Sequence, residues 1–166
     1  MFLLKRFVRF SLLLPVLLFT SQCLHGQQIP AMGIDAIINR ASSKDTVYIV
    51  NFWATWCAPC VQELPVFNSL QKKYADKPVK VLLVSMDFKE DYPMKLATFI
   101  QRKKLLPDVI WLSDTNPNDF VPKVDKAWEG SIPATVIVHK GSQTKEFIEG
   151  QVTEKQVAGI VDGIIR

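Results

Sequence analysis

Cysteine and histidine are scarce in this chain of 166 residues, which has three cysteines and two histidines. Only Cys57 and Cys60 lie close together, and there is no second C-x-x-C pair. A structural zinc site takes four ligands, usually of these residue types, so zinc is disfavoured. Attachment of a c-type haem needs a histidine directly after the second cysteine, and Val61 stands there instead. We therefore expect no metal and no cofactor.

A strong excess of one charge is also missing once the N-terminal segment is set aside. The whole chain has 20 basic and 16 acidic residues, a net charge of +4. Residues 1–26 supply three of the bases and no acid, so residues 27–166 carry only +1. A strongly basic charge is the main sequence evidence for a nucleic-acid partner, and residues 27–166 do not have it. Repeats and low-complexity tracts are absent as well, and residues 27–166 are expected to form one domain.

Residues 1–26 have the layout of a secretory signal peptide. A basic start is followed by an apolar run at residues 10–19 and then by polar residues. The uncharged stretch is shorter than the ~20 residues of a membrane-spanning helix. No polar face marks it as a buried amphipathic helix. We expect export, so that the mature chain works in the periplasm or elsewhere outside the cytoplasm.

The end of this leader has more than one possible position. Peptidase cleavage after Gly26 would leave residues 27–166 as the mature domain, and cleavage after Cys23, before Leu24, is a second peptidase site. Alternatively, a lipoprotein leader ends before Cys23, and lipidation of that cysteine would tether the protein to a membrane. Gln22 is a poor residue directly before a lipidated cysteine, which favours the first arrangement.

The C-x-x-C pair stands where a strand pattern changes to a helix pattern. An apolar run at residues 47–53 ends just before Cys57, and amphipathic helical spacing begins behind the pair. Free N–H groups and the positive end of the helix dipole stabilise a thiolate there, and the thiolate is the reactive form. Cys60, one turn later, is placed to attack a mixed disulfide formed by Cys57. We expect Cys57 to be the exposed nucleophile and Cys60 the buried resolving thiol.

A disulfide between these two cysteines would contribute little to folding. It closes a very short loop, and by the chain-entropy argument such a loop adds little stability. Without the leader these are the last two cysteines, so no framework of structural disulfides exists. A pair that does little for stability in an exported domain is better explained by catalysis.

Three motifs stand in a fixed order along the chain. They are N-F-W-A-T-W-C-A-P-C at residues 51–60, E-L-P at residues 63–65, and S-I-P-A-T at residues 131–135. With them, residues 32–166 resemble the thioredoxin superfamily, and within it the TlpA/ResA-like group of exported thiol-disulfide oxidoreductases. The resemblance implies an α/β domain with the thioredoxin fold. Its three α/β/α layers would enclose a mixed central sheet, with a TlpA-like helix-strand insertion between residues 87 and 114.

Hydrophobic periodicity agrees with this fold. It predicts helices over 34–41, 61–74 and 94–104, buried strands over 46–53, 79–86 and 109–112, and a hairpin of 134–139 with 145–148. Thr153 is the expected N-cap of a last helix that reaches Ile165. The turn-rich stretch 113–121 is predicted to be a surface loop. The N-terminal hairpin common in the TlpA/ResA-like group is expected to be reduced to one helix.

Several residues around the cysteines gain a role from the resemblance. Pro59 restricts the start of the helix, where its missing N–H costs little. Ile132-Pro133 resembles the family's cis-proline loop, whose backbone pairs with an extended substrate chain; the alternative is an ordinary trans proline. Trp56 is expected to shape the substrate surface, while Trp53 belongs in the core.

Two positions depart from thioredoxin itself. Thioredoxin has a buried aspartate where this chain has Asn51, and a lysine on the neighbouring strand where Leu83 stands. Asparagine cannot take up a proton, so another group must activate Cys60. Glu63 and a water molecule are the candidates; the alternative for Glu63 is an exposed helix residue.

The resemblance implies an enzyme that exchanges disulfides with other proteins and favours net reduction. Its partners would be cysteine-containing exported proteins and a membrane electron donor of the DsbD/CcdA type, and the protein itself is expected to be a monomer. A disulfide-forming oxidase is one alternative. A peroxidase of the peroxiredoxin class is disfavoured because the C-x-x-C is intact. A thioredoxin-fold binding module would be expected to lack one of the cysteines.

Overall fold

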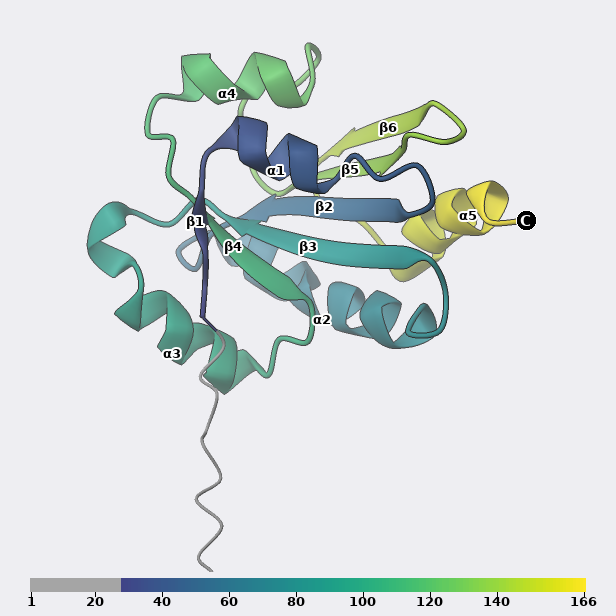
Figure 1. Ribbon diagram of the computed structural model, residues 1–166. Coiled ribbons are helices and arrows are strands. Elements are labelled where there is room, and N and C mark those ends of the chain that lie inside the picture. Colours follow the sequence, from purple (N-terminus) through teal and green to yellow (C-terminus); the bar gives the residue numbers. More distant parts are fainter. Residues whose placement is uncertain (1–27) are drawn as a thin grey trace, which may run out of the picture.

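A six-stranded mixed sheet is the middle layer of the computed structural model, which describes residues 28–166 (Figure 1). Across the sheet the strands stand in the order β1 (Ala31–Met32), β4 (Asp108–Leu112), β3 (Val79–Ser85), β2 (Val47–Trp53), β5 (Ala134–His139) and β6 (Thr144–Glu149). The first four strands are parallel, β5 is antiparallel to β2, and β6 is antiparallel to β5. The predicted signal peptide and Cys23 lie outside the described residues. No helix within 28–166 is long and apolar enough to cross a membrane.

Helices cover both faces of this sheet, as Figure 1 shows. One face carries α1 (Ile34–Arg40) and α4 (Pro117–Val124), and the other carries α2 (Ala58–Lys73), α3 (Met94–Lys103) and α5 (Glu154–Ile164). Each side has its own hydrophobic core. Val50 and Phe52 of β2 pack toward α1 and α4, whereas Ile49 and Trp53 pack toward α2 and α5. The predicted three-layer thioredoxin fold with a mixed sheet is therefore confirmed.

Strand β2 runs through the middle of the sheet and leads to the cysteines. All seven of its residues are buried, because helices cover both of its faces. A strand covered on both sides has a continuous apolar run in place of an apolar-polar alternation. The chain therefore emerges at the carboxyl end of β2 from a rigid support, four residues before Cys57.

The predicted helix-strand insertion is present between β3 and α4. It holds a 3-10 turn, η1 (Lys89–Asp91), followed by α3 and β4, and it places β4 between β1 and β3. The Trp111 ring on β4 stacks on Tyr92 with centroids 4.3 Å apart. The Trp111 indole N–H donates to the Asp87 backbone carbonyl at 2.8 Å. These contacts tie the insertion to the end of β3, the edge of the sheet where the cysteines also lie.

The prediction of a surface loop over 113–121 was wrong, because α4 begins within it. The Asn116 side chain caps this helix by accepting from the Asn118 N–H at 3.2 Å, and Pro117 opens its first turn. Phe120 and Val124, four residues apart, are both buried. The Asp, Asn and Pro residues that suggested a loop form the cap and the exposed face of a short helix.

A second correction concerns the N-terminus of the domain. The sequence suggested one helix there, but a short strand, β1, precedes α1 and pairs in parallel with Trp111 and Leu112 of β4. Two residues are too few to show a period of two, so the pattern alone does not reveal this strand. The hairpin of β5 and β6 and the N-cap by Thr153 are as predicted.

Candidate redox-active site

Cys57 and Cys60 form a disulfide at the start of α2, with an S–S distance of 2.04 Å. Cys57 is the N-cap residue, and its Sγ accepts a hydrogen bond from the Cys60 N–H at 3.3 Å. Pro59 lies in the first turn, and Cys60 completes that turn. Both sulfur atoms therefore lie at the positive end of the helix dipole, where a thiolate is stabilised.

The two cysteines differ less in exposure than the sequence suggested. Cys57 is 6% exposed and Cys60 is 0% exposed. The expected order holds, since only Cys57 has any contact with solvent. In the disulfide state, however, Cys57 is a nearly buried residue and not an open one, because the sheet edge and neighbouring loops close around it.

One of these loops carries Ile132 and Pro133 at the start of β5. The peptide bond between them is cis, as expected. The Ile132 carbonyl oxygen lies 3.7 Å from Cys57 Sγ. The Pro133 carbonyl accepts from the Gly150 N–H at 2.8 Å, which fixes the loop against the end of β6. Ile132 and Cys57, which are 75 positions apart in the sequence, thus come together at the sulfur of the candidate nucleophile.

Glu63 is buried one turn after Cys60 on α2, with 3% of its surface exposed. Its Oε1 accepts from the Asn51 side-chain amide at 2.8 Å, and its Oε2 accepts from the Val152 N–H at 2.9 Å. Burial raises the pKa of the Glu63 carboxyl, and these two hydrogen bonds only partly oppose that rise. The alternative of an exposed helix residue was wrong.

Asn51 joins Glu63 to the neighbouring strands. Besides the Glu63 bond, its amide N–H group donates to Thr135 Oγ1 at 3.1 Å. Its own Oδ1 is buried and has no partner among the described residues. Leu83 stands directly opposite Asn51 on β3 and is fully buried, as the comparison with thioredoxin suggested. The only carboxyl group in this buried network is therefore that of Glu63.

Asp87 is a second buried carboxyl group at this edge of the sheet, and sequence reasoning missed it. It is 4% exposed and follows the end of β3. Its carboxylate accepts from the Thr55 N–H at 3.0 Å and from the Ser85 hydroxyl at 2.7 Å. Thr55 lies two residues before Cys57, so Asp87 holds the loop that presents the nucleophile. Its place at the carboxyl end of a parallel strand beside β2 was the signal that could have revealed it.

Exposed apolar side chains gather next to the cysteines. Trp56 is 54% exposed and stacks on Phe88 with ring centroids 5.7 Å apart; Phe88 is 62% exposed. Met94, 77% exposed, lines a small pocket together with Thr55. Phe88 and Met94 come from the insertion and were not singled out in the sequence. Trp53 is fully buried, as expected.

The described residues contain no group of three or more histidine, cysteine and acidic side chains arranged to hold a metal ion. A disulfide at a helix N-terminus, a backbone carbonyl beside it and a buried carboxyl group one turn away are sufficient for exchange between thiols and disulfides.

Known proteins resemble this chain in sequence and in fold. The thioredoxin-like protein YneN of Bacillus subtilis is 29% identical over 147 residues, which cover 82% of this chain and 78% of YneN. Thiol-disulfide oxidoreductase ResA of Oceanobacillus iheyensis is 29% identical over 117 residues, 70% of this chain; the chain spans 56% of the length of that relative. A solved structure of a thioredoxin-related protein from Neisseria meningitidis serogroup B is 26% identical. The TM-score of the match is 0.62. The match covers 73% of this chain and 86% of the Neisseria chain.

These matches confirm the resemblance to ResA-like proteins that the motifs indicated. A family model described as the AhpC/TSA family matches residues 26–144. That range includes both cysteines, the insertion and the loop at Ile132 and Pro133. With its thioredoxin fold and its Cys57–Cys60 disulfide, this chain belongs to the AhpC/TSA family.

Proposed function

We propose that this protein works outside the cytoplasm as a reductant of disulfides in other exported proteins. Its enzyme class is thiol-disulfide oxidoreductase, the name that its ResA relatives carry. The observation that carries the proposal is the Cys57–Cys60 disulfide at the first turn of α2, with the Ile132 carbonyl beside Cys57 Sγ. The first 26 residues, with their signal-peptide layout, support the location.

The reaction requires two exchanges at sulfur. In the reduced enzyme the Cys57 thiolate attacks one sulfur of a substrate disulfide, and the other substrate sulfur leaves as a thiolate. The Cys60 thiol then loses its proton and attacks Cys57 Sγ in the mixed disulfide. The substrate leaves with both sulfurs reduced, and the enzyme keeps the Cys57–Cys60 disulfide. Two electrons have passed to the substrate, and a membrane donor of the DsbD/CcdA type would restore them.

Glu63 is the proposed proton acceptor for Cys60. It lies one turn further along α2, it is buried, and burial raises the pKa of its carboxyl group toward the range useful for proton transfer near neutral pH. Asn51 and Val152 hold its two oxygens in place. Asp87 stabilises the loop before Cys57 through Thr55, which makes it a positioning residue.

The substrate is expected to bind across the exposed apolar side chains and the loop at Ile132. The stacked rings of Trp56 and Phe88 offer a rigid apolar surface beside Cys57. An extended substrate chain can pair with the backbone of the Ile132 loop. Flexible or unfolded segments of exported proteins meet both requirements, which favours disulfides of proteins over small-molecule disulfides as substrates.

The trapping experiment uses the full chain carrying Cys60→Ser, produced in a bacterium that exports it. Without the resolving thiol, Cys57 should remain joined to its substrates, so that disulfide-linked species accumulate in the extracytoplasmic fraction and disappear on reduction. Cys57→Ser with Cys60 intact is the matched control and should capture far less. Failure to recover mixed disulfides outside the cytoplasm, or rapid consumption of hydrogen peroxide by the reduced protein, would contradict the proposal.

A further inference from the structure

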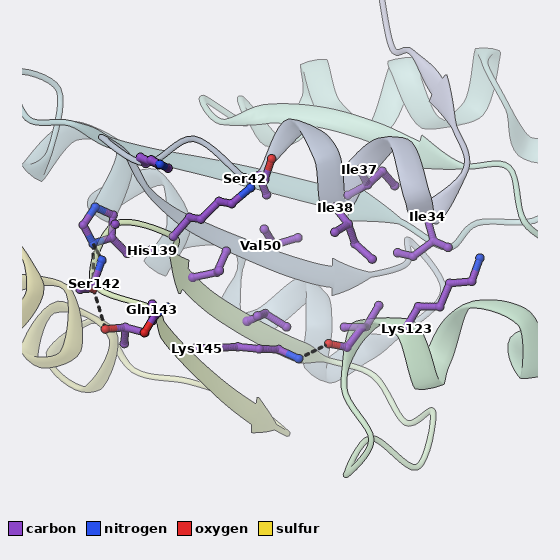
Figure 2. Close-up of a pocket in the computed structure, with 18 of the residues that line it drawn as sticks. Ile34, Ile37, Ile38, Ser42, Val50, Lys123, His139, Ser142, Gln143 and Lys145 are labelled. Atoms are coloured by element: carbon purple, nitrogen blue, oxygen red, sulfur yellow. Dashed lines mark hydrogen bonds between the residues drawn. The ribbon is translucent and has the colours of Figure 1, made fainter.

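A groove of about 700 Å³ lies on the face of the sheet that carries α1 and α4, away from the cysteines (Figure 2). Its walls come from α1, from the sides of β2 and β5 that face α1, from the end of α4 and from the turn between β5 and β6. Ile34 and Ile38 of α1 and Val50 of β2 line it (Figure 2), and Val138 of β5 belongs to the same lining. Ile38 is 42% exposed, although α1 otherwise packs its isoleucines inward. The volume is in the range typical of small-molecule sites, about 300–1,000 Å³.

The groove has a closed polar end at the turn between β5 and β6. A Cβ atom at Gly141 would collide with the Lys44 backbone carbonyl, so the turn packs directly on the loop that follows α1. Ser142 Oγ lies 2.8 Å from His139 Nδ1 and 2.7 Å from Thr144 Oγ1. These bonds hold the turn in one shape. Figure 2 shows the three polar side chains His139, Ser142 and Gln143 together at this end.

Among the described residues, the lysines on the groove rim lack a carboxylate partner only at this hairpin end. Four lysines and no acidic residue line the groove. Lys123 pairs with Asp35 at 2.7 Å and Lys145 pairs with Asp125 at 2.8 Å, which neutralises the end near α4. Lys44 and Lys140, at the hairpin end, have no carboxylate partner within 4.0 Å among residues 28–166.

We propose that this groove binds an amphiphile with a single alkyl chain and a carboxylate head. The chain lies in the groove beside α1 and covers Ile38, whose exposed surface gains most from removal from water. The carboxylate lies at the hairpin end, where Lys44 and Lys140 supply positive charge. An apolar groove with its free charge at one closed end matches a ligand with one charged end.

Direct binding to the full chain tests this inference without any measurement of redox activity. Decanoate, below its micelle concentration, should bind saturably at one site per chain in isothermal titration calorimetry. The matched neutral probe is 1-decanol. Lys44→Gln with Lys140→Gln should weaken decanoate about three- to tenfold, as expected for rim charges, and should leave decanol within twofold. Ile38→Ser should weaken both probes.

Two control variants separate the groove from general effects of charge and apolar surface. Lys72→Gln with Lys103→Gln makes the same charge change on α2 and α3, on the opposite face, and should leave both affinities unchanged. Leu106→Ser changes another exposed apolar residue, 47% exposed, outside the groove. Absence of saturable decanoate binding would overturn the proposal, and so would equal weakening by the control variants. Concentration-dependent dimerisation that Ile38→Ser abolishes would instead assign the groove to a second copy of the chain.

Discussion

Cys57 and Cys60 differ at the residue scale in what surrounds each sulfur. Cys57 stands outside the helix as its N-cap, receives the Cys60 N–H and has the only solvent contact of the pair. Cys60 is enclosed on the first turn. Reactivity toward a small reagent follows thiolate character and access together, and both favour Cys57.

In the reduced protein near neutral pH, iodoacetamide should therefore modify Cys57 well before Cys60. Peptide mass mapping after a short exposure measures the order. In Cys57→Ser the remaining Cys60 should react at least tenfold more slowly than Cys57 does in Cys60→Ser, since full burial blocks the reagent. A label found first on Cys60 would reverse the two roles.

Glu63 makes the stability of the oxidised protein depend on pH. Burial raises the pKa of its carboxyl above the ordinary value of 4.5, so the folded protein holds this proton more tightly than the unfolded chain does. The associated stability is fully present below about pH 4.5 and is lost as pH rises through the folded-state pKa. The free energy of unfolding should fall across this window in the parent protein.

Glu63→Gln removes this titration and should flatten that part of the profile. Urea unfolding at a series of pH values measures it, and the difference between parent and variant should shift in favour of the variant as pH rises. Glu146→Gln, on the exposed side of β6, controls for the loss of one charge and should keep the parent's slope. A parent–variant difference that shifts in favour of the parent as pH rises would mean that the two hydrogen bonds to Glu63 outweigh its burial.

At the scale of elements, the insertion does more than widen the sheet. Its first residues bring Phe88 onto Trp56 and place Met94 beside Thr55. Trp111 on β4 and the Asp87 backbone fix this segment by a hydrogen bond. An element added to the fold therefore supplies part of the surface next to the nucleophile, and substrate preference should depend on it.

Phe88→Ala should raise KM for a disulfide-containing unfolded protein about fivefold or more, the usual effect of truncating an aromatic anchor. The kcat value should change less than twofold, because Phe88 does not contact either sulfur. Steady-state reduction kinetics separate the two parameters. Leu106→Ala, another exposed apolar residue, should leave both unchanged. An unchanged KM in Phe88→Ala would remove Phe88 from the proposed substrate surface.

At the scale of the whole molecule, the direction of electron flow depends on how strongly the fold stabilises the reduced pair. One helix N-terminus and Pro59 support the Cys57 thiolate, and no basic side chain among residues 28–166 forms a hydrogen bond to its sulfur. Moderate stabilisation of the thiolate favours a reductant, because strong stabilisation makes the protein an oxidant. DsbA is such an oxidant, with a reduction potential of roughly −120 mV.

Equilibration with glutathione should therefore give a potential below roughly −200 mV, in the reducing part of the range known for thioredoxin-fold proteins. The helix N-terminus should hold the pKa of the Cys57 thiol moderately below its ordinary value, as in thioredoxin. Both are measured on the same preparation, by quantifying the disulfide and by thiolate absorbance. A potential near roughly −120 mV with a strongly acidic Cys57 would make the protein an oxidase and leave the fold and residue roles in place.

The sequence by itself determined those features that depend on neighbours along the chain. The central strand before Cys57, the helix after it and the β5–β6 hairpin follow from local periodicity and turn residues. The N-cap position of Cys57 follows from the same strand-to-helix change. The order of the motifs was sufficient to indicate the thioredoxin fold.

Only the tertiary structure decided which polar and apolar groups meet across long separations. Glu63 is buried because Val152, 89 residues away, and Asn51 enclose its two oxygens. Helix α4 forms where a loop was predicted, because Phe120 reaches the buried ring of Trp128. Burial and hydrogen-bond partners depend on how distant segments pack. A local pattern of residues carries no record of that packing, so these features were outside its reach.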